Sequence, residues 1–372
     1  MKPIKYLIEQ TYSRGLENLV AGQTSIAMLD GERGNLLYRG YDIEELADLS
    51  TFDEVSYLLI HGELPTTSQF QGWVNELDTW NEPPVEAISV LDSLPTDTPP
   101  LMLYRTMASI AACNIPEGEN VRMDAQWRRP ARILGWSSTL AAAAICHVLG
   151  RRPNPFNPEQ SFAVNFLTRS LGRKPTQFEA EAFDVSLIVQ AEHGFNVAAL
   201  AALTVISTGA DLGSAVLAGL SALAGKLHGG TNQLAFQNIM QHESAKDARA
   251  WVKRKLKDGY RFPGFGHRIY QTHDPRARIL EPLARKLVED RGDGHIWEIY
   301  ETIRDEVESN LGDKGIFINV GGVSGLIYHA LGFPMSSYPI PMALAIQTGL
   351  MAHCLEYLSE GNMIEPGAIY TG

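Results

Sequence analysis

Helical periodicity dominates this chain of 372 residues and limits the folds open to it. Residues 52–61 and 178–192 carry apolar side chains at spacings of three and four, which is typical of a helix with one buried face. Strand-like alternation is scarce, with short candidates at residues 24–29 and 36–38. The sequence therefore predicts an all-α fold with very little sheet.

Several helix ends are marked by capping residues. Asp53-Glu54 should open a helix that stops at His61-Gly62, and Thr176 with Glu179 three residues later resembles a capping box. Pro and Gly cluster in three stretches that predict loops, at residues 95–100, 151–158 and 262–266.

The middle of the chain predicts a boundary between two domains. A small apolar helix is expected over residues 214–226, and a polar helix is expected from Thr231 to about Gly259. Between them lies Gly229-Gly230, and a glycine pair can end one helix and act as a pivot for the next. We therefore place a hinge there.

Charge and composition favour small molecules or proteins as partners. With 31 basic and 43 acidic residues, the net charge of -12 opposes binding to nucleic acid or to an anionic membrane surface. The charge-free stretch 193–210 is rich in small polar residues and favours a buried helix pair over a membrane span.

Cysteine usage and the amino-terminal sequence favour a cytoplasmic location. The three cysteines lie far apart and form no CxxC pair, which predicts neither a disulfide framework nor a thiolate metal site: Cys113, Cys146 and Cys354. The first residues show no apolar segment typical of a secretory signal.

Three histidines lie in contexts that suit a binding site. His228 precedes a glycine pair, and it is either an imidazole offered to a ligand or a cap on the negative end of a helix. His267 follows a Gly-Phe-Gly run, and it belongs either to a cationic pocket or to a surface loop whose Arg and Asp pair. His193 is either a polar contact to substrate or a satisfied core histidine.

The order of the motifs is more specific than any one motif. They are Leu36-Leu-Tyr-Arg-Gly-Tyr-Asp-Ile43, Ala191-Glu-His-Gly-Phe-Asn196, Leu227-His-Gly-Gly230, Gly264-Phe-Gly-His-Arg-Ile-Tyr270 with Asp274-Pro-Arg-Ala277, and Ile369-Tyr-Thr-Gly372. In this order, and in register from about Gly15 to Gly372, the chain resembles the citrate synthase family, including its short bacterial type and the 2-methylcitrate synthases.

The resemblance implies a helical homodimer whose subunit has a large domain, residues 1–229 plus 333–372, and a small domain, residues 230–332, with a cleft between them. It also implies a reaction of the tricarboxylic acid cycle type. An acyl-CoA such as acetyl-CoA is enolised, and its carbon attacks the ketone of a 2-oxo acid such as oxaloacetate. The product thioester is then hydrolysed, which releases coenzyme A as a free thiol. The coenzyme A thioester is then a substrate, and neither a permanently bound cofactor nor a metal is expected.

Site residues follow from the same resemblance, position by position. His228 matches the histidine that hydrogen-bonds the thioester oxygen of the developing enol, and His267 matches the one that polarises the acceptor ketone. His193 and Arg276 match groups that hold the acceptor's carboxylates. The coenzyme A contacts fall on the glycine-rich loop and the arginine after its histidine: Gly264, Phe265, Gly266 and Arg268.

The chain differs from the family at the position of the catalytic aspartate and at two positions that bind the carboxylates of the acceptor. The catalytic Asp of the family falls on Gly321, and two of its three carboxylate-binding arginines fall on Ile346 and on Glu365, the latter reached from the partner subunit. Gln271 also stands where the family often has a basic residue near the CoA phosphates. Glu365 is therefore our candidate for a substitute base, with a solvated carboxyl-terminal glutamate as the alternative.

The expected losses in rate and in binding free energy from these replacements predict impaired citrate formation. A positioned general base is worth roughly 10²–10⁴ in rate, and each lost charge-assisted hydrogen bond costs roughly 1.5–3 kcal/mol. We therefore expect an acyl-CoA-dependent acyltransferase with an altered acceptor. Two alternatives stay open: a catalytically silent CoA-binding or regulatory paralogue, and a thioester hydrolase or lyase.

Overall fold

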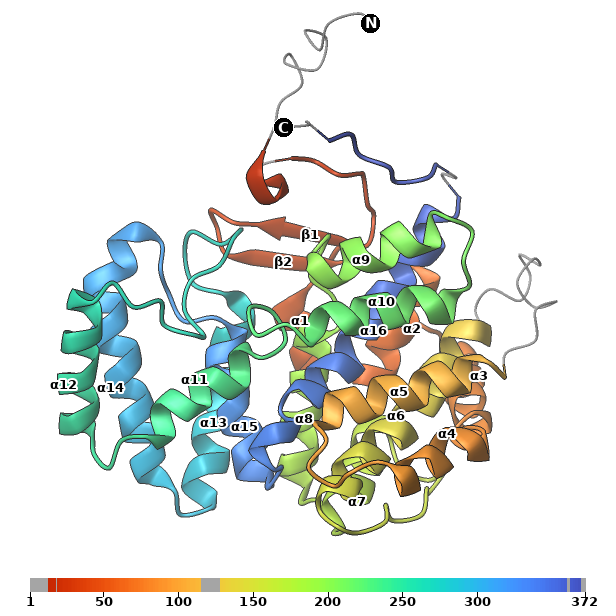
Figure 1. The fold of residues 1–372 in the computed structure, drawn as a ribbon, viewed down its shortest axis with the longest axis horizontal. Helices are drawn as coiled ribbons and strands as arrows, with labels where there is room; N and C mark the ends of the chain where they lie inside the picture. Colours follow the sequence, from red (N-terminus) through yellow and green to blue (C-terminus); the bar gives the residue numbers. More distant parts are fainter. Residues whose placement is uncertain (1–12, 18, 115–127, 360–361, 369–372) are drawn as a thin grey trace, which may run out of the picture.

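The computed structural model describes residues 13–17, 19–114, 128–359 and 362–368 of the chain. These residues form sixteen α-helices and one small antiparallel sheet (Figure 1). The prediction of an all-α fold is therefore confirmed. The last sequence motif, residues 369–372, lies outside the described residues.

The sheet is a three-stranded meander near the amino-terminal end of the described chain. Strands β1 (Ala27–Asp30), β2 (Asn35–Tyr38) and β3 (Tyr41–Asp42) lie in that order. The two strand predictions are confirmed with small shifts in their bounds. At Gly34, in the turn between β1 and β2, φ is +66° and an added Cβ would lie 2.7 Å from the carbonyl oxygen of His273. The hairpin therefore packs directly on the turn that precedes Asp274.

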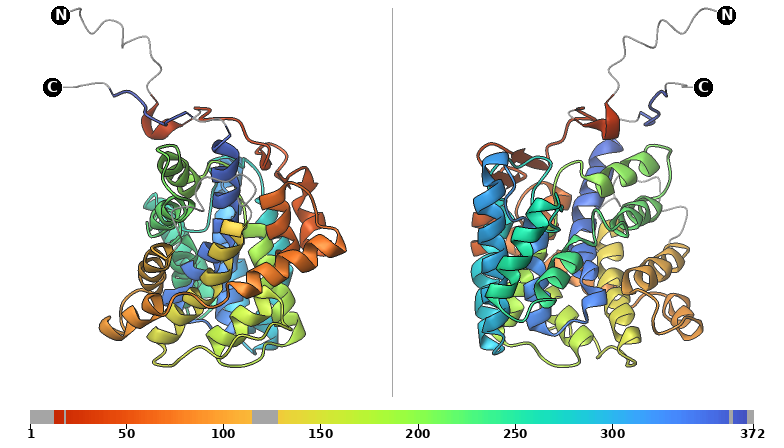
Figure 2. Two further views of the ribbon diagram at one scale, coloured as in Figure 1. Left: turned by 90° about the vertical axis from the view of Figure 1, so that its right-hand side faces the viewer. Right: turned by 60° about the vertical axis from the view of Figure 1, so that its left-hand side comes forward.

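A first group of helices surrounds one central helix, α16 (Pro339–Tyr357), which is buried along most of its length and packs against α2, α5, α6, α8, α9 and α10. The views in Figures 1 and 2 show α16, in blue, running through the middle of this group. Its other members are α1 (Ile43–Leu49), α2 (Phe52–His61), α3 (Thr67–Thr79), α4 (Val85–Ser89), α5 (Pro100–Ala112), α6 (Arg128–Val148), α7 (Phe162–Leu171), α8 (Gln177–Gln190), α9 (Val197–Ile206) and α10 (Leu212–Leu223).

A second group lies to one side of the first in Figure 1. It contains α11 (Thr231–Met240), α12 (Ala245–Lys257), α13 (Pro275–Asp290), α14 (Gly294–Leu311) and α15 (Val320–Leu331). Within it, α13 packs on α15, α11 on α15, and α12 on α14, whereas α13 and α15 also contact α8 of the first group. The segment joining the two groups at residues 224–230 carries His228.

The capping box predicted at Thr176 begins α8, whereas α2 begins at Phe52, one residue before the predicted Asp53-Glu54. Both begin with a complete capping box, Thr51 with Glu54 and Thr176 with Glu179, in which side chain and backbone bond reciprocally. Helix α2 ends at Gly62, whose φ of +95° suits a residue without a Cβ.

Two sequence predictions about the helices are wrong. The polar helix expected from Thr231 to about Gly259 is split into α11 and α12, because Ser244 caps a new helix by accepting a hydrogen bond from the Asp247 amide. The apolar helix expected to reach residue 226 ends at Leu223, and Gly230 begins α11. The glycine pair therefore lies at the start of the next helix and does not end α10.

The apolar stretch 193–210 forms α9 and the turns beside it, and α9 packs on α10. This confirms a helix pair. In the described part of the chain, no helix has the length and hydropathy needed to span a bilayer.

Replacing either of two helical glycines with alanine should change the stability of the protein, but in opposite directions. An added Cβ at Gly349 of α16 would overlap the Glu192 carboxylate and lie 2.6 Å from the Ala191 carbonyl oxygen, whereas Gly72 of α3 has nothing within 4 Å. We expect Gly349→Ala to lower the free energy of unfolding by about 1–3 kcal/mol through overpacking. The matched Gly72→Ala should raise it by about 0.5–1 kcal/mol. Urea unfolding measures both, and equal effects would contradict the packing described.

Candidate active site

Two of the predicted histidines come together although 74 residues separate them in sequence. The rings of His193 and His267 lie with centroids 4.9 Å apart at 73° to each other, and Tyr270 lies against both. Nε2 of His193 is 3.3 Å from the hydroxyl oxygen of Tyr270. His193 follows α8, and His267 and Tyr270 lie in the loop before α13, so the cluster joins the two groups of helices.

Backbone hydrogen bonds fix the tautomer of His267. Its Nδ1 accepts hydrogen bonds from the amides of Ile269 at 3.0 Å and Tyr270 at 3.2 Å. Because Nδ1 is an acceptor, the proton of the neutral ring must lie on Nε2. Burial, followed by the charge of Arg276, lowers the pKa of His267 to about 4. Near neutral pH, His267 is therefore an uncharged hydrogen-bond donor through Nε2.

The other two histidines are also held neutral. Burial, and then the positive charge of Arg276, lowers the pKa of His193 well below its ordinary value. Burial also lowers the pKa of His228, whose Nε2 is buried and finds no hydrogen-bond partner in the described residues. An imidazole nitrogen without a hydrogen-bond partner is available to a ligand. His228 lies five residues beyond the end of α10, so it does not cap that helix.

Arg276 is buried beside this cluster and is clamped by Asp274. Its backbone amide and Nε donate to Oδ1 of Asp274, both at 3.0 Å, and its Nη2 donates to Oδ2 at 2.8 Å. Both residues are almost fully buried. Burial opposes ionisation of Asp274, but the charge of Arg276 outweighs it and lowers the pKa of the carboxyl. The Arg–Asp pairing named in the alternative for His267 therefore occurs, but it lies in the interior and not on the surface.

The glycine-rich loop packs on the start of α15. The Gly266 amide donates to the Phe317 carbonyl oxygen at 2.7 Å, and Phe265 forms an isolated β-bridge with Ile318. Gly264, with φ of +84°, is so close to the helix that an added Cβ would lie 2.6 Å from Cα of Gly322. The two backbones are in direct contact there, so neither Gly264 nor Gly322 leaves room for a side chain.

Gly321, near the start of α15, lies beside Thr231, which in turn bonds to His228. Asn319 caps α15 by accepting a hydrogen bond from the Gly321 amide at 2.9 Å. A Cβ added at Gly321 would lie 3.3 Å from Cγ2 of Thr231, and the Thr231 hydroxyl donates to the His228 carbonyl oxygen at 3.1 Å. Thr231 thus contacts both segments, and nothing projects from residue 321.

The remaining positions singled out in the sequence are dispersed. Ile346 is buried within α16 and belongs to the hydrophobic core. Glu365 is exposed in the segment that follows α16, which Figure 1 shows at the same end of the molecule as β1. Arg268 is exposed, and its Nη1 donates to the Gly15 carbonyl oxygen at 3.3 Å.

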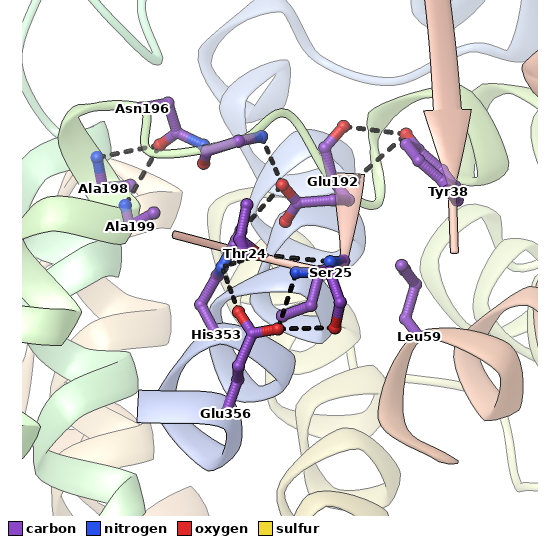
Figure 3. Close-up of polar contacts among 12 residues, drawn as sticks. Thr24, Ser25, Tyr38, Leu59, Glu192, Asn196, Ala198, Ala199, His353 and Glu356 are labelled. Atoms are coloured by element: carbon purple, nitrogen blue, oxygen red, sulfur yellow. Dashed lines mark hydrogen bonds and ion pairs between the residues drawn. The ribbon is translucent and has the colours of Figure 1, made fainter. Parts of the chain in front are cut away.

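A buried ion pair supports the segment that carries His193 (Figure 3). Nε2 of His353 lies 2.9 Å from Oε1 of Glu192, and the same oxygen accepts a hydrogen bond from the Gly194 amide. Burial disfavours a charged His353 ring, but Glu192 outweighs it and raises the pKa of His353. The Tyr38 hydroxyl donates to the Glu192 carbonyl oxygen at 2.8 Å. Residues on both sides of His193 are therefore fixed.

Sequence reasoning missed the roles of four residues in this arrangement. Asp274 and Tyr270 lay inside a quoted motif, but their spacing did not show that one clamps Arg276 and the other contacts His193. Glu192 was adjacent to a candidate histidine, which was a usable signal. His353 is 161 residues away from Glu192, and nothing in the sequence pairs them.

Among the described residues, no group of three or more His, Cys, Asp or Glu side chains is arranged to hold a metal ion. The cluster instead places neutral imidazoles, of which His267 is a fixed donor through Nε2, next to one clamped guanidinium. Such a set can stabilise negative charge that develops on oxygen, because the donors are already oriented and largely desolvated.

Comparison with known proteins identifies the family of this fold. Residues 15–367 match the family model described as citrate synthase, C-terminal domain. The citrate synthase of Saccharolobus solfataricus is 32% identical, covering 97% of this chain and 96% of its own length, and the citrate/2-methylcitrate synthase of Bacillus subtilis is 30% identical, covering 98% and 97%.

A solved structure extends the similarity to the whole fold. It is the ternary complex of the citrate synthase of Thermoplasma acidophilum with carboxymethyl coenzyme A and oxaloacetate, with a TM-score of 0.93, 29% identity, and coverage of 97% of this chain and 96% of that one. The chain belongs to the citrate synthase family.

The lowered pKa of His267 predicts a loss of stability in acid. The unfolded ring takes up a proton near its ordinary pKa of 6.5, whereas the folded ring resists protonation until about 4. Its contribution, on the order of 1–3 kcal/mol, is therefore present above pH 6.5 and is lost as the pH falls toward 4. Urea unfolding across this range should show a steeper decline for the wild type than for His267→Gln.

The exposed His295→Gln substitution controls for the loss of an imidazole elsewhere. If the wild type and His267→Gln lose stability in parallel between pH 6.5 and 4, burial does not hold His267 neutral.

Proposed function

We propose that this chain is an acyl-CoA-dependent acyltransferase that joins the α-carbon of a thioester to the ketone carbon of a 2-oxo acid. The observation that supports this most is the pairing of His193 with His267, both neutral, beside the buried Arg276. The named activity of the relatives, and the carboxymethyl coenzyme A and oxaloacetate of the Thermoplasma complex, support the same reaction class.

The two catalytic roles require different histidines. Enolising a thioester moves charge onto its oxygen, and the unpartnered Nε2 of His228 suits a donor to that oxygen. Nε2–H of His267 suits the acceptor ketone, because its tautomer is fixed by two backbone amides. A neutral donor stabilises a developing oxyanion without attracting an anion to the same place beforehand.

Binding roles fall to the residues around these histidines. Arg276 has Nη1 left over after its bonds to Asp274, so it can hold one carboxylate of the acceptor together with His193. Gly264, Phe265 and Gly266 with Arg268 form the loop that would contact coenzyme A. The tight packing of this loop on α15 holds its backbone amides in place.

We further propose the domain division expected from the sequence. The large domain comprises residues 1–229 and 333–372, and the small domain comprises residues 230–332. The segment 224–230 then hinges the two, carrying His228 at the hinge. Assembly as a cytoplasmic homodimer belongs to the same proposal, and it would bring Glu365 of one subunit toward the site of the other.

Ordinary citrate formation should be slow in this protein. Gly321 supplies no base, Ile346 supplies no guanidinium, and Glu365 would place a negative charge near an incoming carboxylate. The loss of the base alone corresponds to roughly 10²–10⁴ in rate, and the reversed charge works against an anionic acceptor such as oxaloacetate.

Thiol release tests both parts of the proposal. With acetyl-CoA and oxaloacetate, kcat/KM should be at least about 100-fold below that of the Saccharolobus solfataricus enzyme assayed beside it. Acyl-CoA should nevertheless raise the melting temperature of the protein. His228→Asn and His267→Asn should reduce turnover further, whereas the exposed His295→Asn should not.

Three outcomes separate the alternatives. Turnover equal to that of the relative would refute the impairment. Stabilisation by CoA with no turnover of any thioester would favour a silent binding protein. Thiol release that does not depend on a 2-oxo acid would favour a hydrolase. Glu365→Gln adds one further test: it lowers acetyl-CoA turnover only if Glu365 is the substitute base.

A further inference from the structure

The site is rich in hydrogen-bond donors and poor in groups that could remove a proton. His267 cannot act as a base through Nδ1, which accepts two backbone hydrogen bonds, nor through Nε2, which carries the proton. Burial raises the pKa of Tyr270, so its hydroxyl keeps its proton. Burial lowers the pKa of His228, which weakens that ring as a base.

The carboxylates next to the histidines in the described residues are already engaged. Asp274 accepts three hydrogen bonds from Arg276 and a fourth, at 3.0 Å, from the amide of Val320. Glu192 faces His353 and the Gly194 amide. Glu308 accepts the amide of Ile318 at 2.8 Å. Gly321, beside Thr231, contributes no side chain.

A thioester can become an enolate without losing a proton if it loses carbon dioxide instead. We propose that the acyl donor of this protein is a 2-carboxyacyl-CoA, of which malonyl-CoA is the simplest, and that its decarboxylation generates the nucleophile. This inference rests on the proposed function, because it uses the same site and the same carbon–carbon bond formation. It names the class of donor substrate.

The bonds and electrons balance without a further reactant. The bond between the α-carbon and the carboxylate carbon breaks, and its electron pair forms the carbon–carbon double bond of the enolate as CO2 leaves. The thioester oxygen takes the displaced carbonyl pair and is stabilised by His228. The α-carbon then bonds to the ketone carbon, and the ketone oxygen takes a proton from Nε2 of His267, which solvent restores.

The surroundings of Gly321 suit the carboxylate that must leave. A carboxylate at residue 321 would repel it, and glycine removes that repulsion. Thr231 presents a methyl group and Asn319 its side-chain oxygen to this position, while Ile318 and Ala235 lie against the neighbouring Gly322 and Gly264. The Thr231 hydroxyl donates to the His228 carbonyl oxygen and the Asn319 amide to the Gly266 carbonyl oxygen. A localised carboxylate is therefore less well solvated there than in water, which favours its conversion to an enolate whose charge is spread and hydrogen-bonded.

The experiment compares two thioesters on the full chain. Malonyl-CoA, labelled in its free carboxyl group, is followed by release of labelled CO2, and acetyl-CoA is followed by thiol release, each with and without oxaloacetate as the probe acceptor. We expect kcat/KM for malonyl-CoA to exceed that for acetyl-CoA by at least about 100-fold, because the base that acetyl-CoA needs is worth that much. Equal values, or no CO2 release, would overturn the inference.

Two substitutions at one position sharpen the test. Gly321→Asp restores a carboxylate, so it should lower CO2 release from malonyl-CoA at least about tenfold and raise thiol release from acetyl-CoA. Gly321→Asn has nearly the same shape and no charge, so it should retain more CO2 release than Gly321→Asp and should not raise acetyl-CoA turnover. An added Cβ at residue 321 lies 3.2 Å from the Asn319 side chain, so melting temperatures must confirm that both variants fold.

The failure of this inference can be told from failure of the proposed function. If acetyl-CoA condenses with oxaloacetate while malonyl-CoA keeps its carboxylate, the decarboxylation is wrong and the acyltransferase stands. If neither thioester reacts, and His228→Asn leaves the melting temperature shift caused by each thioester unchanged, then both are wrong. Equal effects of Gly321→Asp and Gly321→Asn on CO2 release would also overturn the inference.

Discussion

The contact on which the site depends most is the buried carboxylate of Asp274. Its two oxygens accept the amide, Nε and Nη2 of Arg276 and the amide of Val320, so one side chain caps α13, orients the guanidinium and fixes the start of α15. Charge-assisted hydrogen bonds of this kind are among the stronger ones in proteins. Removing one partner would leave an uncompensated buried charge.

Around that contact, backbone packing sets the positions of the reacting groups. The close approach of Gly264 to Gly322 brings the loop before His267 directly onto α15, and Thr231 connects that helix to the segment with His228. The second support is the Glu192 pair with His353, which holds the loop with His193 against the central helix α16. Three contacts therefore hold the site in place: the Asp274 pair with Arg276, the packing of Gly264 on Gly322, and the Glu192 pair with His353.

Much of the fold was predictable from the sequence, because helical periodicity and capping residues are local signals. The capping box at Thr176 and the turn at Gly62 act through neighbouring backbone groups, so they were recognised without knowing the fold, and the box at Thr51 offered the same local signal although it was not used. The split between α11 and α12 was missed because the cap at Ser244 was not weighed against a long polar pattern.

The candidate site was predictable in its residues and not in its geometry. The motifs brought forward His193, His228, His267 and Arg276 as candidates. The tautomer of His267 depends on backbone amides that a sequence does not position. The Glu192 pair with His353 is a contact between distant segments, and the sequence left open whether Arg276 pairs with Asp274, which accepts from its Nε and Nη2.

We conclude that this site stabilises an enolate and that, among the described residues of one subunit, the carboxylates beside the histidines are engaged and do not form that enolate by removing a proton. Proton removal by Glu365 of a second subunit is the alternative. The most direct test of this conclusion is mass spectrometry of acetyl-CoA incubated with the protein in D2O, with malonyl-CoA in a parallel sample. We predict that the acetyl group of added acetyl-CoA gains no deuterium above a control without protein, while malonyl-CoA loses CO2. Protein-dependent deuterium in added acetyl-CoA would show that a base is present and would contradict the account.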